Sequence, residues 1–172
     1  MEQTKSRSPG LHLSDVIHNM DVTLLKTQET AIDEGTLFQF EKGYLWETAL
    51  SRAFGEKVAQ RIGELTLDGI IMSPDGVSYE EDGTFILEEY KCTALSADRS
   101  PSAMWKWLMQ VKGYCKAIGT TKCIFRILHH VDITRNPDKC YAVWEMVFTQ
   151  NEIDENWEAI LNHAKTMKEG VR

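Results

Sequence analysis

The stretch from Ser73 to Cys92, SPDGVSYEEDGTFILEEYKC, decides the expected fold. Val77–Glu80 and Thr84–Cys92 are rich in β-branched and aromatic residues, as β-strands are. The segment Glu81-Asp82-Gly83 between them is typical of a tight turn. A hairpin centred on Asp82 places Asp75 opposite Glu89, within the roughly 5 Å that separates the Cβ atoms of a cross-strand pair.

This hairpin brings acidic side chains close to a lysine. Because side chains alternate along a strand, Glu89 and Lys91 share one face, while Glu88 and Tyr90 share the other. Carboxylates as close as those of Asp75 and Glu89 repel unless a proton or a divalent cation lies between them. Mg²⁺ is the most plausible cation for such an oxygen pair, with Mn²⁺ as a substitute. A surface ion pair between Glu89 and Lys91 is the alternative, but the strand is apolar enough to be central, where burying a pair is costly.

A helix expected over about Gly43–Ile62 carries one more acid of interest. Its apolar residues Trp46, Leu50, Phe54 and Val58 form one stripe at helical spacing. Glu47 falls inside that stripe, so its carboxylate must be paired, bind a cation or lie at the rim of the core.

The remaining pattern predicts one α/β domain over residues 11–172, preceded by a flexible tail over residues 1–10. Leu11–Phe40 shows only a weak, mixed pattern. Asp68, the second choice after Asp75 for the acid that acts with Glu89, lies in an expected strand at Leu65–Met72. A further helix, two strands and a last helix are expected at Ala103–Ile118, Cys123–Val131, Lys139–Phe148 and Ile153–Lys168. This order of elements predicts a mixed central sheet flanked by helices.

Two motifs in this order resemble the PD-(D/E)XK nuclease superfamily. Ser73-Pro74-Asp75-Gly76 followed by Glu89-Tyr90-Lys91-Cys92 is similar to the signature of its phage lambda exonuclease and viral recombinase (YqaJ-like) branch. The spacing from Leu87 to Glu89 is one residue longer than in that branch. Gln110-Val111-Lys112-Gly113-Tyr114 resembles the Q-x-x-x-Y motif of the RecB-like and lambda-type nucleases. The resemblance implies a restriction-endonuclease-like core.

The resemblance also implies roles for individual residues. Asp75, Glu89 and the carbonyl of Tyr90 would hold Mg²⁺, with Glu47 as a further ligand. Lys91 would orient or help deprotonate the attacking water and steady the phosphate charge. Gln110 and Tyr114, on one helix face, would contact DNA near the scissile phosphate. Ordinary helix-edge positions for these two residues, and an arginine-paired rim position for Glu47, remain the alternatives.

Charge leaves the choice of partner open. The 172 residues carry a net charge of −7, which argues against nucleic acid at face value. Yet Lys91–Arg126 holds seven basic residues and one acidic residue, a local excess that could bind phosphates. Arg99, Lys112 and Lys116 are the DNA-contacting candidates in this segment. A solvated helix face is an equally good interpretation of the lysines.

Other features narrow the class of protein. No apolar run approaches the roughly 20 residues of a membrane helix, so we expect a cytoplasmic protein, in the host cytoplasm if phage-encoded. The four cysteines form no CxxC pair, which argues against a zinc ribbon. His129 and His130 are adjacent on a strand, so they point to opposite faces and cannot chelate one ion together.

The sequence therefore predicts a Mg²⁺-dependent DNA nuclease, more specifically an exonuclease of the phage recombination or DNA-processing type. A restriction-like or structure-specific endonuclease and a non-cleaving nucleic-acid-binding module are the alternatives. DNA is the expected partner, and a homo-oligomer or a recombination partner is possible.

Overall fold

The hairpin at the centre of the fold is formed as expected. The computed structural model describes residues 8–24, 33–54 and 60–169. In it β4 (Gly76–Tyr79) pairs antiparallel with β5 (Phe85–Thr93), and Gly76 lies opposite Glu88. This is the register of a hairpin centred on Asp82, so the predicted alignment of Asp75 with Glu89 is confirmed.

The hairpin belongs to a mixed sheet of four strands in the order β4-β5-β6-β7. β6 (Lys122–His129) runs parallel to β5, and β7 (Tyr141–Val147) runs antiparallel to β6. A parallel step needs a crossover connection, and the segment between β5 and β6 contains a helix that supplies it. The predicted mixed α/β architecture is confirmed.

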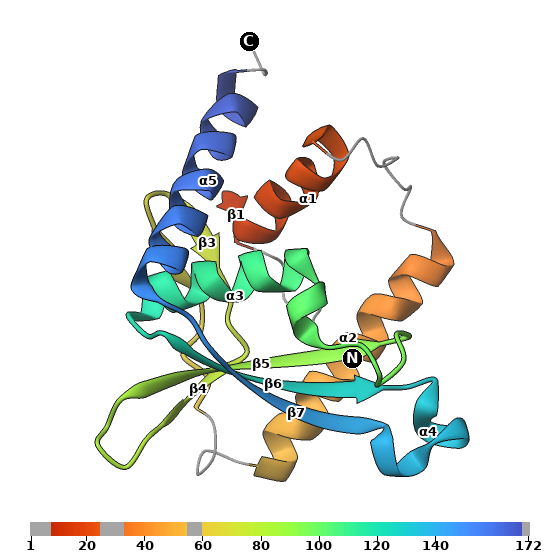
Figure 1. Ribbon diagram of the computed structural model, residues 1–172. Helices are drawn as coiled ribbons and strands as arrows, with labels where there is room; N and C mark the ends of the chain where they lie inside the picture. The colour runs from red at the N-terminus through yellow and green to blue at the C-terminus, as the bar shows by residue number, and fades with distance from the viewer. Residues whose placement is uncertain (1–7, 25–32, 55–59, 170–172) are drawn as a thin grey trace.

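Helices cover both faces of this sheet (Figure 1). α3 (Trp105–Ile118) packs on one face, where Trp107 stacks on Phe125 with 6.1 Å between ring centroids. α1 (Leu13–Leu24) and α5 (Gln150–Glu169) pack against α3. α2 (Glu34–Phe54) contacts β5, and its Trp46 meets the ring of Tyr141 edge-on. The core therefore lies between the sheet and the α1–α3–α5 layer.

Gly113 permits the close approach of α1 to α3. A Cβ atom built on Gly113 would lie 2.8 Å from Cδ2 of the buried Leu13. Only glycine therefore fits between the two helices without displacing Leu13.

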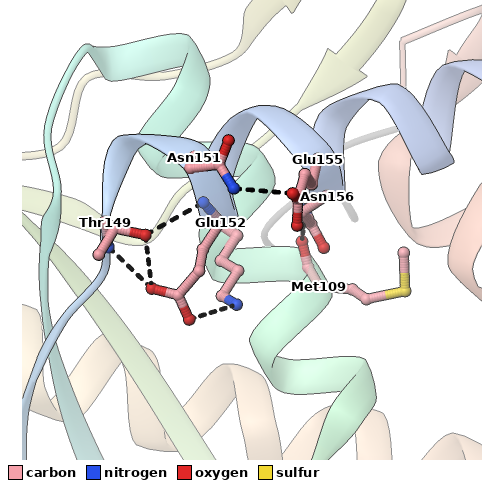
Figure 2. Close-up of polar contacts among 7 residues, drawn as sticks. Met109, Thr149, Asn151, Glu152, Glu155 and Asn156 are labelled. Carbon is pink, nitrogen blue, oxygen red and sulfur yellow. Dashed lines mark hydrogen bonds and ion pairs between the residues drawn. The ribbon is translucent and has the colours of Figure 1, made fainter.

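The start of α5 is held by reciprocal hydrogen bonds (Figure 2). The backbone N–H of Thr149 donates to Oε2 of Glu152 at 2.8 Å, and the N–H of Glu152 donates to Oγ1 of Thr149 at 3.2 Å. This is a capping box, which satisfies backbone donors that the first turn leaves free. Asn156 also donates to the carbonyl of Met109 at 3.1 Å, which joins α5 to α3.

The expected strand at Leu65–Met72 is wrong as a single element. It divides into β2 (Leu65–Leu67) and β3 (Ile70–Met72), which pair antiparallel around Asp68 and Gly69, with φ of +51° and +78°. These strands and β1 (Leu11–His12) form a separate three-stranded sheet in the order β1-β3-β2. Asp-Gly is the typical dipeptide of such a tight turn, so the signal was present in the sequence.

The boundaries of the first long helix also differ. α2 begins at Glu34 rather than near Gly43, and the structure describes it as far as Phe54. Val58, expected in its apolar stripe, lies outside the described residues, as do residues 1–7 of the expected tail. Gln60 already forms an isolated bridge with Val77, so the helix does not continue to Ile62.

Short elements complete the chain. η2 (Pro101–Ala103) precedes α3, and α4 (Asp132–Arg135) and η3 (Pro137–Lys139) lie between β6 and β7. α3 ends at Ile118, as expected, and Gly119 follows with a φ of +80°, a conformation that suits glycine. None of the helices described is long and apolar enough to cross a membrane.

Candidate active site

Asp75, Glu89 and Lys91 lie together where β5 passes the start of β4. Lys91 Nζ donates to Oε1 of Glu89 at 2.6 Å, and the backbone N–H of Tyr90 donates to Oδ2 of Asp75 at 2.7 Å. The Glu89 side chain is only 2% exposed and that of Lys91 only 18%. The structure thus brings together the acid pair and the lysine predicted from the hairpin.

Burial and mutual repulsion make the two carboxyls hard to ionise. Desolvation raises the pKa of Asp75 well above its usual value, and the nearby charge of Glu89 raises it further, while Lys91 opposes both effects. Desolvation also raises the pKa of Glu89, and again Lys91 acts in the other direction. Desolvation alone would lower the pKa of Lys91, but its two acidic neighbours more than compensate and raise it. The cluster therefore favours any additional positive charge that enters it.

One oxygen of this cluster has no partner among the described residues. Oε2 of Glu89 is buried and accepts no hydrogen bond from any described residue, although buried carboxylate oxygens are normally satisfied. Mg²⁺ is commonly bound by one or two carboxylates and keeps several waters. Asp75 and Glu89 therefore suit this ion chemically, and Oε2 of Glu89 is available as a metal ligand.

Glu47 lies near this pair without completing a three-acid cluster. Its charge raises the pKa of both Asp75 and Glu89, so it acts on the site electrostatically. Its own Oε1 is ion-paired with Nη2 of Arg61. Within residues 8–24, 33–54 and 60–169, no group of three or more His, Cys, Asp and Glu side chains is arranged to hold a metal ion. The carboxylate expected in an apolar stripe is thus half-buried and paired with an arginine.

Arg61 is the residue that the sequence reasoning missed. It follows Gln60, whose backbone N–H and carbonyl pair with Val77 at 2.7 and 2.9 Å, so β4 fixes this segment beside Asp75. Its charge also lowers the pKa of Tyr90, whose net value burial raises to about 12. No local sequence pattern identifies Arg61, because its proximity depends on the pairing of Gln60 with Val77.

Gln110 and Tyr114 reach the same site from α3. Gln110 Oε1 accepts from Lys91 Nζ at 2.9 Å, and Gln110 Nε2 donates to the Tyr114 hydroxyl at 2.8 Å. Tyr114 is only 5% exposed, and desolvation followed by the charge of Glu89 raises the pKa of its hydroxyl. The structure thus places the two motifs of the sequence in one hydrogen-bonded network.

Asp68 has a different position. It lies in the turn between β2 and β3, where its Oδ2 accepts from Nε1 of Trp157 at 2.8 Å. Asp68 therefore links the small sheet to α5, and the first-choice acid, Asp75, is the one that faces Glu89.

The basic segment is largely neutralised by acids from elsewhere in the chain. Lys112 binds Glu152 at 3.4 Å and Lys116 binds Asp154 at 2.7 Å, so both hold α5 against α3. Further ion pairs join Lys106 to Asp21, Lys122 to Glu80 and Arg126 to Glu88. Arg99 is exposed in the loop before η2. Of the three DNA-contacting candidates, only Arg99 stands apart from α5.

Glu88 occupies the opposite face of β5. Its carboxylate is 1% exposed and binds Arg126 through two hydrogen bonds of 2.8 and 3.2 Å. Ser78 donates to it as well, at 3.0 Å. Both oxygens of Glu88 thus accept hydrogen bonds, whereas Oε2 of Glu89 accepts none from the residues that the structure describes.

The histidine pair behaves as its alternation implies. His129 is buried and its Nδ1 lies 2.9 Å from the carbonyl oxygen of Leu95, while His130 lies 3.2 Å from Nζ of Lys42. The two rings thus have separate surroundings.

Solved structures of exonucleases share this fold. The alkaline exonuclease LHK-Exo from Laribacter hongkongensis superposes with a TM-score of 0.54 at 19% identity, covering 99% of this chain and 86% of that chain. LHK-Exo in complex with dAMP gives a TM-score of 0.57 at 18% identity, covering 94% and 91%. A phage-related exonuclease from Haemophilus somnus 129PT gives 0.55 at 10% identity, covering 93% and 83%. No protein-family model matches the sequence, and no curated protein matches it. At these identities the likeness concerns the fold, and it agrees with the fold that the sequence motifs imply.

Proposed function

We propose that this chain, which has the fold of alkaline and phage-related exonucleases, is a Mg²⁺-dependent deoxyribonuclease that acts on DNA ends. One observation carries the proposal: half-buried Asp75 and Lys91 adjoin buried Glu89, whose Oε2 has no partner among the described residues. Burying such a cluster is costly, and a metal-assisted reaction gives it a purpose.

The acids and the lysine have complementary tasks in this reaction. Asp75 and Glu89 would hold Mg²⁺ together with the Tyr90 carbonyl, and Glu47, which the motif resemblance implies as a further ligand, would have to leave Arg61 to join them. The bound ion would supply an activated water and neutralise charge on the phosphate. Lys91, held on Glu89, would orient the attacking water and stabilise the negative charge that develops on the phosphate.

The fold favours exonuclease action, because three solved structures with TM-scores of 0.57, 0.54 and 0.55 are exonucleases by name. A role in phage recombination or DNA processing rests on the motif resemblance. A homo-oligomer or a recombination partner is compatible with this proposal, and neither is needed for the chemistry of the cluster.

The first experiment compares four substrates, linear and circular plasmid, each double-stranded and single-stranded, with Mg²⁺ or with EDTA. The expected result is progressive loss of linear DNA with Mg²⁺ only. Cleavage of the closed circle would instead identify an endonuclease. Binding without cleavage, unaffected by Asp75→Asn, would identify a non-cleaving module.

A further inference from the structure

The Lys91 ammonium is held by α3 as well as by its own strand. Its Nζ donates to Gln110 Oε1 at 2.9 Å and lies 5.9 Å from the centroid of the Trp107 ring. Tyr114, the next residue of this set, binds Gln110. Residues 107, 110 and 114 lie on one side of a helix, so a single face of α3 surrounds the lysine.

The hydrogen-bond chemistry fixes the direction of this network. Lysine can only donate, so the oxygen of the Gln110 amide faces Lys91 and its NH₂ group faces the Tyr114 hydroxyl. The hydroxyl is buried and it accepts from Nε2 at 2.8 Å. Lys91 thus sets the orientation of the Gln110 amide, and the Tyr114 hydroxyl holds the NH₂ group at its other end.

We propose that Gln110 and Tyr114 are positioning residues for Lys91: Tyr114 orients the Gln110 amide, and Gln110 directs the ammonium toward the Asp75–Glu89 site. The inference rests on the proposed nuclease function and assigns these two residues to the lysine instead of to direct contact with DNA. With two Nζ protons on Glu89 and Gln110, the third is left for the water or phosphate.

The burial of these groups supports an indirect role. Tyr114 is 5% exposed, so its side chain offers little surface to a phosphate. The hydrogen bonds from Lys91 through Gln110 to Tyr114 thus join β5 to α3.

The test measures cleavage and DNA binding separately. Tyr114→Phe keeps the buried ring and is expected to lower kcat about 10-fold, as loss of a positioning contact does, with KM and the Kd for linear duplex in EDTA unchanged within twofold. Gln110→Leu is expected to lower kcat further, also without changing Kd. A direct contact with DNA would instead raise Kd and KM in both variants, and that result would overturn the inference.

A double variant tests whether Tyr114 acts through Gln110. If it does, Tyr114→Phe added to Gln110→Leu costs nothing more, because the amide that Tyr114 orients is already absent. Multiplying losses would contradict the proposed order. Tyr141→Phe, which removes a hydroxyl 3.3 Å from Arg126 on the far side of the sheet, is the matched control and should cleave like the wild type.

A spectroscopic measurement separates this inference from the nuclease proposal. In protein labelled with ¹⁵N-lysine, the Lys91 ammonium signal, assigned by its loss in Lys91→Arg, should be sharp because its protons are held by Glu89 and Gln110. Tyr114→Phe should broaden it through faster exchange, and Tyr141→Phe should not. A sharp signal in Tyr114→Phe would refute the positioning role even if the protein cleaves DNA. If the Lys91 signal broadens in Tyr114→Phe but the wild type never cleaves DNA, the positioning role stands and the nuclease proposal is refuted.

Discussion

Lys91 and Glu89 form an ion pair of 2.6 Å between residues two apart on the same face of β5. A carboxylate as buried as that of Glu89 is rare in proteins unless it is paired, and here the lysine that pairs with it comes from the same strand face. β5 alone therefore assembles this part of the site, and removal of either member of the ion pair should have measurable consequences.

Lys91→Met should abolish cleavage and destabilise the fold, because Glu89 would then be buried without its cation. Breaking one partner of a buried pair costs about 3 kcal/mol of unfolding free energy. Adding Glu89→Gln should recover most of that loss and leave cleavage absent. Urea denaturation with EDTA present measures the first effect, and linear-duplex digestion measures the second. Full activity of Lys91→Met would contradict the assigned role.

Asp75→Asn should stabilise the metal-free protein while it abolishes cleavage. Its carboxyl has a raised pKa, so ionised Asp75 destabilises the fold at neutral pH, and stability is lost as pH rises from the usual carboxyl range through the raised pKa. The amide keeps an oxygen for the Tyr90 N–H. We expect a gain of about 1 kcal/mol in the free energy of unfolding, at the low end of what replacing buried ionic groups gains. A melting temperature of Asp75→Asn below that of the wild type, in EDTA at pH 8, would show that the Asp75 charge does not destabilise the fold.

Mg²⁺ binding should strengthen as pH rises. The raised pKa values of Asp75 and Glu89 mean that protons compete with the cation at higher pH than for ordinary carboxyls. Calorimetric titration in two buffers of different ionisation enthalpy should therefore reveal proton release on binding. An Mg²⁺ affinity that does not change as pH rises above the usual carboxyl range would exclude these acids as the ligands.

Arg61→Gln should tighten Mg²⁺ binding, because it frees Glu47 and removes a positive charge near the acids. A change of about threefold in Kd, below 1 kcal/mol, is expected for a partly exposed pair. Arg52→Gln removes the same charge from the last turn of α2 and serves as the control. Equal effects of the two variants would show that Arg61 acts only through net charge.

Gly113→Ala should destabilise the fold, since the new Cβ would meet Leu13 at 2.8 Å. Overpacking of this kind costs about 1–3 kcal/mol, more than alanine gains over glycine in a helix. Gly43→Ala in α2 meets no atom within 4 Å and should be neutral or stabilising. Thermal unfolding of both variants checks this pair of opposite signs.

Local signals in the sequence predicted those parts of the molecule that local chemistry determines. The turn residues at Asp82 and Gly83 fixed the hairpin register, and Gly119 marked the end of α3 because a left-handed residue suits glycine. The same local reasoning brought Asp75, Glu89 and Lys91 together, since a strand and its hairpin partner are enough to place them.

Contacts between segments that are far apart in the sequence could not be predicted from local sequence signals. The pairing of Gln60 with Val77 brings Arg61 to Glu47, and the packing of α5 on α3 turns Lys112 and Lys116 into ion-pair partners. Lysines on a helix look alike in sequence whether they meet DNA or a neighbouring helix. The division of Leu65–Met72 into two strands depends on no distant contact, because Asp68-Gly69 is itself a local turn signal.

The back-to-back acids of β5 make the site sensitive to strand slippage. A shift of one position along β4 and β6 would turn Glu88 inward and Glu89 outward, exchanging two chemically identical side chains. The three hydrogen bonds from Arg126 and Ser78 hold Glu88 on its present face and so favour the observed alignment. Weakening this anchor should therefore give a mixture of two alignments, in which some molecules present the wrong glutamate to the catalytic side.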